Sequence, residues 1–373
     1  MIFHYSLSVS SGYIKAANEP LDQSGTVTLA EGYVSALLHR RRFSLLAQHD
    51  AQFTRAPGIG IGFGQYERSA LSFAGRKSRL TTWTFLFENG YGSDGARAAG
   101  DLGNAALNGE AVPNLNVVAF GLTTGNILSD HALFSMDHKL SPSRVLNFSA
   151  GGYFHHFFDG GTSDQQYSLT TGMQQRVSTR QTVGINVRAV QENYTQTHCT
   201  TGFVGLSSFT QLTRTLRFEG MAGPAWGTAY CSGTYEYTAS LAMRAGQHGL
   251  LYVGSTRQRN DGLVLNSTWE TSTFGGLALG QPRRIQALAT GGYSNYALAK
   301  HTAAFPNLHG YFVSGELHRR LTSAAEVSMT ARYFSNSQGQ ATGNMFLFTS
   351  TYTWSPEDRH THRWSQGIVH GNR

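Results

Sequence analysis

A unit of two alternating apolar and polar segments, joined by a short turn, recurs about every 40 residues along the chain. One copy covers residues 128–158 and turns at 140–144, and another covers 167–194 and turns at 176–180. Because alternation has a period of two, each segment carries apolar side chains on one face and polar side chains on the other. Repeated through the chain, the unit predicts a single sheet with one apolar side and one polar side.

The composition indicates what the apolar side meets. Charged residues make up 14% of the 373 residues and aromatic residues 12%, with 43 glycines and 8 prolines, whereas soluble domains average about 25% charged residues. No apolar run reaches the roughly 18 residues that a transmembrane helix needs. This combination is typical of a transmembrane β-barrel, in which half of each strand faces water.

The alternating segments number about 18, an even number as in bacterial barrels, and no linker or change of period divides them. We therefore predict an all-β fold: a transmembrane antiparallel up-and-down β-barrel that occupies residues 1–355 as a single domain, followed by a polar tail at 356–373. Short turns alternate with longer connections such as 14–25 and 93–126. That alternation predicts short periplasmic turns, longer extracellular loops and both termini on the periplasmic side.

The polar faces of the segments carry charges of both signs. The candidate pore-lining residues are Arg188, Arg217, Arg244, Arg332, Glu236 and Glu316, and further inward charges are Asp50, Arg68, Glu88, Glu219 and Glu270. Since neither sign dominates, we expect no strong preference for anions or for cations.

The turns and the last segment resemble those of a known family. Between apolar strands, a Leu-Thr/Ser-x-Arg-Thr/Ser pattern is matched by Leu140-Ser141-Pro142-Ser143-Arg144, Leu212-Thr213-Arg214-Thr215 and Leu321-Thr322-Ser323. In this respect the chain resembles the porin-like outer-membrane β-barrels of Gram-negative bacteria, a group of large and mostly uncharacterised proteins. The resemblance implies a location in the bacterial outer membrane, with outer-membrane lipid and lipopolysaccharide around the barrel.

The closing segment resembles the C-terminal assembly signal of such barrels. Its alternating residues Phe346, Phe348, Tyr352 and Trp354 imply recognition by the barrel-assembly machinery, although a polar tail follows where the family pattern ends. An outer-membrane protein also requires a signal peptide. Residues 1–5 lead directly into an alternating segment and show none, which is the main observation against this location.

Residues 93–126 form the longest connection. In porins of similar layout the third long loop folds into the lumen, so the resemblance makes Asp94, Arg97, Asp101 and Glu110 candidate constriction residues opposite wall arginines such as Arg188. Facing charges would create a transverse field that orients polar solutes. An outer loop without a role in the pore is the alternative, and the sequence favours neither.

No motif predicts a cofactor, a metal site or a catalytic site. His155 and His156 are neighbours on a strand, so they point to opposite faces and cannot share an ion, and the Gly-x-Ser-x-Gly nucleophile motif is absent. Cys199 and Cys231 flank one predicted hairpin at the same rim; a disulfide bond and two separate thiols both fit. Basic turns such as 40–42 suit lipid headgroups better than nucleic acid, so no nucleic-acid partner is predicted.

A barrel of this size leaves an aqueous lumen. We therefore predict a non-enzymatic channel through which small polar solutes diffuse across the outer membrane. An export or assembly barrel for a surface polysaccharide or a lipid-linked polymer is the first alternative, and a rim-sited hydrolase is the second. The transported solute, the gating and a homo-oligomeric state stay open.

Overall fold

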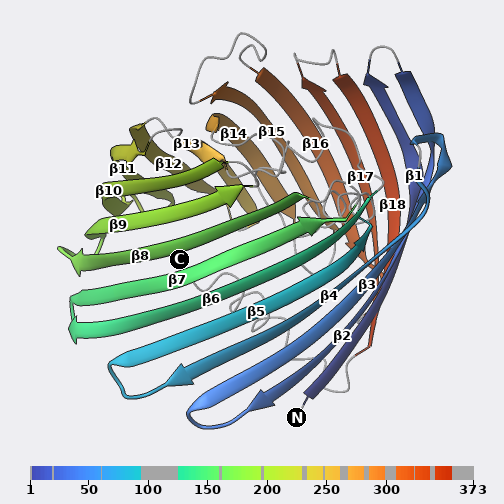
Figure 1. The fold of residues 1–373 in the computed structure, drawn as a ribbon. Coiled ribbons are helices and arrows are strands. Elements are labelled where there is room, and N and C mark those ends of the chain that lie inside the picture. The colour runs from blue at the N-terminus through green and yellow to red at the C-terminus, as the bar shows by residue number, and fades with distance from the viewer. Residues whose placement is uncertain are drawn as a thin grey trace.

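A computed structural model describes residues 2–18, 21–59, 61–93, 125–158, 162–194, 197–228, 233–246, 248–260, 268–280, 285–298, 308–322, 324–336 and 341–354. These residues form one sheet of 18 strands, in which each strand is antiparallel to its neighbours in the chain (Figure 1). Pairing of the first strand with the last closes the sheet. The predicted fold class, an up-and-down transmembrane β-barrel, and the predicted strand number are confirmed.

The strands are β1 (Ile2–Asn18), β2 (Leu21–His39), β3 (Phe43–Ala56), β4 (Ile61–Arg76), β5 (Thr81–Ser93), β6 (Asn126–Ser141), β7 (Arg144–Phe157), β8 (Thr162–Arg176), β9 (Gln181–Tyr194), β10 (Thr197–Gln211), β11 (Leu216–Gly227), β12 (Thr234–Ala245), β13 (Gly249–Asn260), β14 (Thr268–Gly280), β15 (Ile285–Leu298), β16 (Leu308–Arg320), β17 (Ala325–Asn336) and β18 (Ala341–Trp354). A 3-10 turn, η1 (Pro57–Ile59), separates β3 from β4. No helix among the described residues is long and apolar enough to cross a membrane.

Exposure alternates along the strands and separates two faces. In β16 the side chains of Val313 and Leu317 are 59% and 51% exposed, whereas Phe312 and Glu316 are 1% and 3% exposed. Directly paired residues share a face of the sheet, so the ladders extend this assignment around the barrel. The outer face is mostly apolar. Exposing this face to water would cost a free energy of about 25 cal/mol per Å² of apolar area. The face would also be larger than the apolar patches found on soluble monomers, so it is suited to lipid.

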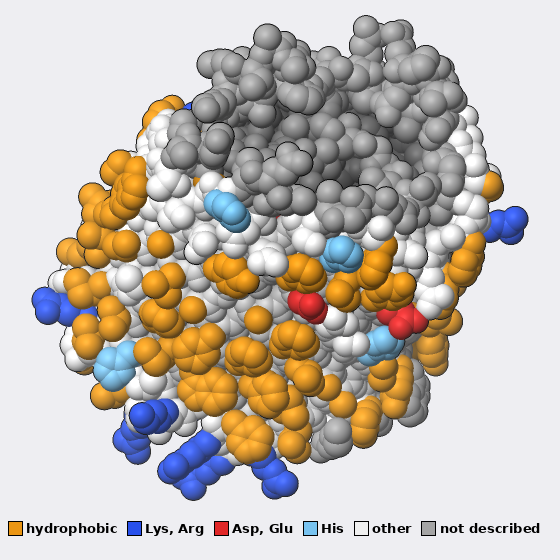
Figure 2. Space-filling view, in the orientation of Figure 1, with side chains coloured by type: hydrophobic (Ala, Val, Ile, Leu, Met, Phe, Trp, Pro, Cys, Tyr) orange, Lys and Arg blue, Asp and Glu red, His pale blue; other side chains and the backbone are white. Residues whose placement is uncertain are grey.

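The two ends of the barrel differ. At one end, called the turn end, the connections are short: the Arg40 N–H donates to the Phe43 carbonyl and the Lys77 N–H to the Thr81 carbonyl. Figure 2 shows basic side chains gathered at this end, beyond a band of hydrophobic side chains. At the opposite end, called the loop end, β5 ends and β6 begins, with Ser93 paired to Asn126. Strand β1 begins and β18 ends at the turn end, as their pairing requires.

The predicted long loop at 14–25 is wrong. Strand β1 continues to Asn18 and β2 starts at Leu21, with Lys15 paired to Ser24 and Ala17 to Asp22. The prediction ended the strand where apolar alternation stops. Beyond the apolar band, however, a strand is held by its backbone hydrogen bonds, which do not depend on side-chain polarity.

Aromatic side chains lie near the edges of the apolar band. Toward the loop end, the rings of Tyr311 and Tyr333 on adjacent strands have centroids 5.7 Å apart and hydroxyl oxygens 3.3 Å apart. Toward the turn end, the indole of Trp83 covers Gly75 on the paired strand, and a Cβ at Gly75 would overlap that ring. Both positions match membrane interfaces, where tyrosine and tryptophan are enriched.

The wall is irregular from β10 to β13, a region we call the seam. The β10–β11 ladder has pairs on either side of Val204 and Gly205 but none at these two residues, where the facing Pro224 has no N–H to donate. The β12–β13 ladder ends at the pair Tyr237–Arg257, although β12 starts three residues earlier and β13 ends three residues later. Strands β12 and β13 therefore separate toward the loop end.

Candidate functional site: the inner wall of the barrel

The six candidate pore-lining residues all belong to the inner face of the sheet. Glu236, Glu316 and Arg332 are buried, Arg188 and Arg217 are half-buried, and Arg244 is exposed near the turn end. The structure does not gather them into one site. It distributes the inward charges over separate groups, and most of these groups pair an acid with a base.

The first group crosses the seam. Arg188 on β9 forms an ion pair with Glu236 on β12, although β10 and β11 lie between them. On the way its guanidinium lies over the ring of Phe203, 5.4 Å from the centroid. Gly223 lies beside this path, and a Cβ there would overlap the backbone of β10. The close approach of β10 and β11 thus lets one side chain bridge four strands.

The second group lies on β16 and β17. Nδ1 of His318 is 2.9 Å from Oε1 of Glu326, and its Nε2 contacts Glu316. Arg332 is 6% exposed, and its Nε and Nη1 have no hydrogen-bond partner among the described residues. The sequence interpretation missed His318, because histidine is counted as neutral. Its position two residues after Glu316 placed it on the same face.

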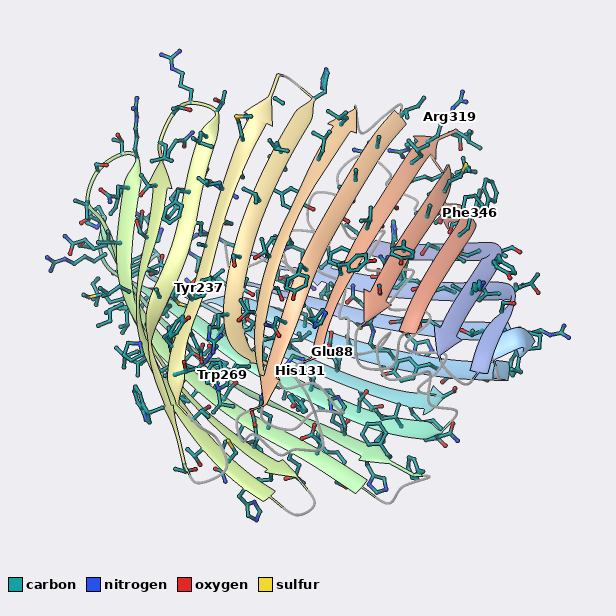
Figure 3. The ribbon with its side chains drawn as sticks, turned by 90° about the horizontal axis from the view of Figure 1, so that it is seen from above. Glu88, His131, Tyr237, Trp269, Arg319 and Phe346 are labelled. Atoms are coloured by element: carbon teal, nitrogen blue, oxygen red, sulfur yellow. The ribbon has the colours of Figure 1, made fainter. Side chains whose placement is uncertain are left out.

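The third group follows β3 to β6. Nε of Arg68 is 2.9 Å from Oδ1 of Asp50, and Nδ1 of His131 is 3.4 Å from Oε2 of Glu88. Figure 3, a view from above, labels Glu88 and His131, which stand at directly paired positions of β5 and β6. Asp50 was expected to face inward, and its 4% exposure agrees with that position.

The histidine pair on β7 behaves as two separate residues. His155 pairs across the ladder with Asp164, its Nδ1 4.0 Å from Oδ2, whereas Nδ1 of His156 lies 2.8 Å from the hydroxyl of Ser163. Within the described part of the chain, no group of three or more His, Cys, Asp or Glu side chains could hold a metal ion.

Several candidates lie outside the described residues. They include Asp94, Arg97, Asp101 and Glu110 of the proposed constriction, and the tail at 356–373. Cys199 is 2% exposed and disulfide-bonded. Cys231 is outside the described residues too, so the pairing of these two cysteines stays a prediction.

Comparison with known proteins gives matches of structure alone. No protein-family model matches the chain, and no curated protein matches its sequence. The siderophore receptor PirA from Pseudomonas aeruginosa is similar with a TM-score of 0.51 and 9% identity, over 94% of this chain and 80% of that one. PirA from Acinetobacter baumannii is similar with a TM-score of 0.51 and 7% identity, over 93% of this chain and 80% of that one.

A. baumannii OccAB4 gives a TM-score of 0.50 and 8% identity, over 95% of this chain and 98% of that one. At such identities the likeness concerns the fold and not the activity. The fold of this chain is that of the outer-membrane β-barrel proteins.

Proposed function

We propose that the protein is an outer-membrane channel through which small polar solutes diffuse passively. The observation that carries the proposal is the division of the closed sheet into an apolar outer face and an inner face with paired charges, such as Asp50–Arg68 and Arg188–Glu236. Barrels of 16–18 strands leave an aqueous lumen. Charges that are paired rather than segregated offer hydrogen-bonding groups to a solute without holding one sign of ion.

The proposal extends to the connection at 93–126 as a constriction. Asp94, Arg97, Asp101 and Glu110 would face arginines of the wall and create a transverse field. Support comes from the length of this connection and from the inner-face positions of Arg188 and Arg217.

The location and assembly of the barrel belong to the same proposal. Outer-membrane lipid and lipopolysaccharide would surround the wall, and the barrel-assembly machinery would recognise the closing strand. Phe346, Phe348 and Tyr352 are 45%, 47% and 55% exposed on the outer face of β18, which supports that recognition.

Single-channel recording in planar bilayers tests the function. Detergent-folded protein, checked by its heat-dependent gel mobility, is added to one side of the membrane. We expect steady current steps, with a reversal potential near zero in a salt gradient, because the inner charges are paired. A correctly folded barrel that inserts and carries no current would refute the open channel and favour the export or assembly barrel.

A further inference from the structure

We propose that the turn end of the barrel is a docking surface for an acidic protein domain, whose carboxylates bind a ring of arginines at the inner edge of the mouth. This ring, called the rim arginines, consists of Arg76, Arg176, Arg244 and Arg320. The proposal goes beyond the passive channel, because it concerns a protein partner and not a solute. In the proposed topology the turn end faces the periplasm, so the partner is a periplasmic domain.

The short connections at the turn end carry positive charge and no negative charge. Each contains at least one arginine or lysine and none contains an aspartate or a glutamate, at 39–43, 76–81, 139–144, 176–181, 211–216, 244–249, 280–285 and 319–325. Figure 2 shows basic side chains of this end standing beyond the hydrophobic band. A surface that carries one sign of charge attracts a partner of the opposite sign and repels others.

The rim arginines stand at the turn ends of four strands. Three of them are the last residues of β4, β8 and β16, and Arg244 is the last but one of β12. Each belongs to the inner face, because an even number of positions on its own strand separates it from an inner-face residue. These residues are Arg68 for Arg76, Thr170 (the partner of Arg188) for Arg176, Glu236 for Arg244 and Glu316 for Arg320.

The spacing of the rim arginines selects a large partner. They lie four strands apart from β4 to β16, and six strands separate β16 from β4 across the closure of the sheet. With about 4.8 Å between strands and a tilt of about 40°, neighbours four strands apart are roughly 25 Å apart along the rim. A small anion or one lipid headgroup cannot contact two of them. A folded domain of about 100 residues, with a radius of gyration of about 13 Å, can.

The rim arginines keep donors available for carboxylates. Arg76 donates through Nε to the Ser78 carbonyl at 3.0 Å, and Arg176 donates through Nη2 to the Pro142 carbonyl at 3.4 Å. Arg76, Arg176 and Arg244 are exposed, and none of the three forms an ion pair with another described residue. Since a guanidinium has five N–H donors in one plane, each of them can still bind a carboxylate at two points.

Lipid headgroups meet the other side of the rim. Val177 follows Arg176, continues the ladder by donating its N–H to the Gln181 carbonyl, and is 59% exposed. Because neighbours on an extended chain point to opposite sides, Val177 points to the membrane and Arg176 to the mouth. In the same way Arg319 is exposed on the outer face while Arg320 faces inward. A headgroup outside the wall therefore reaches Arg319 and not the rim arginines, which favours a partner that covers the mouth.

The docking surface is compatible with a channel of weak selectivity. At physiological ionic strength, charges exposed to water are screened beyond about 8–10 Å. The rim arginines therefore act on a body that touches the rim, and less on ions that pass along the axis of the lumen. The inner charges deeper in the wall, such as Arg68 and Arg188, are paired with carboxylates.

Binding is measured by biolayer interferometry on the full chain in phosphatidylcholine nanodiscs. The probes are two designed helical bundles of about 100 residues, one with glutamates and one with lysines over one end. We expect only the acidic bundle to bind, and more weakly as the salt concentration rises. Arg244→Gln should weaken binding about three- to fivefold, and the triple variant with Arg76→Gln and Arg176→Gln about 30-fold or more.

The matched controls are two arginines at the same end that face outward. Arg144 pairs with Gln175 on the outer face, and Arg319 pairs with Ile285. Arg144→Gln and Arg319→Gln remove the same charge as Arg244→Gln and should leave binding unchanged. Heat-dependent gel mobility verifies that each variant is folded, and Arg244 makes no side-chain hydrogen bond to another described residue, so its loss leaves the fold intact.

Three outcomes would overturn the docking surface: no binding of the acidic bundle, unchanged binding in the triple variant, or equal weakening by Arg319→Gln and Arg244→Gln. Loss of binding when phosphatidylglycerol replaces phosphatidylcholine would show that headgroups occupy the rim arginines, and would overturn the protein partner. Conductance separates the two proposals. A barrel that carries no current but binds the acidic bundle through Arg244 contradicts the channel and supports the docking surface, and steady current without such binding does the reverse.

Discussion

Replacing Val187 with arginine tests which face of the barrel meets lipid. Val187 lies mid-way along β9 and is 40% exposed on the outer face, whereas its neighbour Arg188 faces inward and pairs with Glu236. Val187 is six residues from Gln181 at the turn end, or about 15 Å at roughly 3.3 Å per residue and a tilt of about 40°. That height is close to the middle of an apolar band about 25 Å tall.

An arginine at this depth costs about 2–4 kcal/mol, which lowers the folding equilibrium constant roughly 30-fold to 900-fold. Gln191→Arg is the matched control, because Gln191 is exposed on the same face of the same strand, ten residues from Gln181. At about 25 Å it reaches the edge of the band, where the cost is about 0–1 kcal/mol.

Urea unfolding of the barrel in lipid vesicles measures both free energies. A cost of under about 1 kcal/mol for Val187→Arg would refute the lipid-facing assignment. Equal costs at the two positions would refute the depth argument while leaving the faces intact. A barrel that stays monomeric in water without detergent would contradict the membrane interpretation as a whole.

Four further outcomes are expected. Glu236→Gln leaves the half-buried Arg188 without its anion and should lower the free energy of unfolding by about 3 kcal/mol, whereas the double variant Arg188→Met/Glu236→Met should recover most of it. Gly75→Val should displace Trp83, cost about 1–3 kcal/mol and shift tryptophan emission to the red, whereas Gly315→Ala, whose Cβ meets nothing within 4 Å, should be silent. Deletion of residues 93–126 should raise single-channel conductance, and an unchanged current would exclude a constriction there. Cys199→Ser should lower stability by about 2–5 kcal/mol and remove the difference in gel mobility between oxidised and reduced protein; no difference in the unsubstituted protein would exclude the disulfide bond.

The barrel could be predicted from the period-two pattern. Alternation assigns each side chain to one of the two faces of the sheet, and the difference between short turns and longer connections distinguishes the two ends of the barrel. This information sufficed for the strand number and for the inner-face positions of residues such as Glu236 and Glu316. It failed for the strand ends, where Lys15 pairs with Ser24 beyond the apolar band. Backbone pairing leaves no periodic signal in polar residues, so such extensions are not visible in the sequence.

The pairing of inner charges was not predictable for a different reason. Arg188 reaches Glu236 across two strands, and this contact depends on the close approach of β10 and β11 at Gly223 and on the missing hydrogen bond at Pro224. Those features depend on register, which the sequence pattern fixes only to within a few residues. The contacts of Arg257 with Tyr235 and Trp269 were not predictable either, since they join β13 to β12 and β14 in a register that only the ladders give.

At the seam, contacts between side chains accompany the missing backbone pairs. Where backbone pairs are missing, side chains connect the strands instead: Arg188 pairs with Glu236, and Arg257 lies over Tyr235. Trp269 joins the two, because it contacts Arg257 and also packs in one cluster with Phe203 and Ala225 of the inner face. A wall held partly by side chains can carry specific contacts, whereas a wall held by a continuous ladder offers mainly a repeating surface.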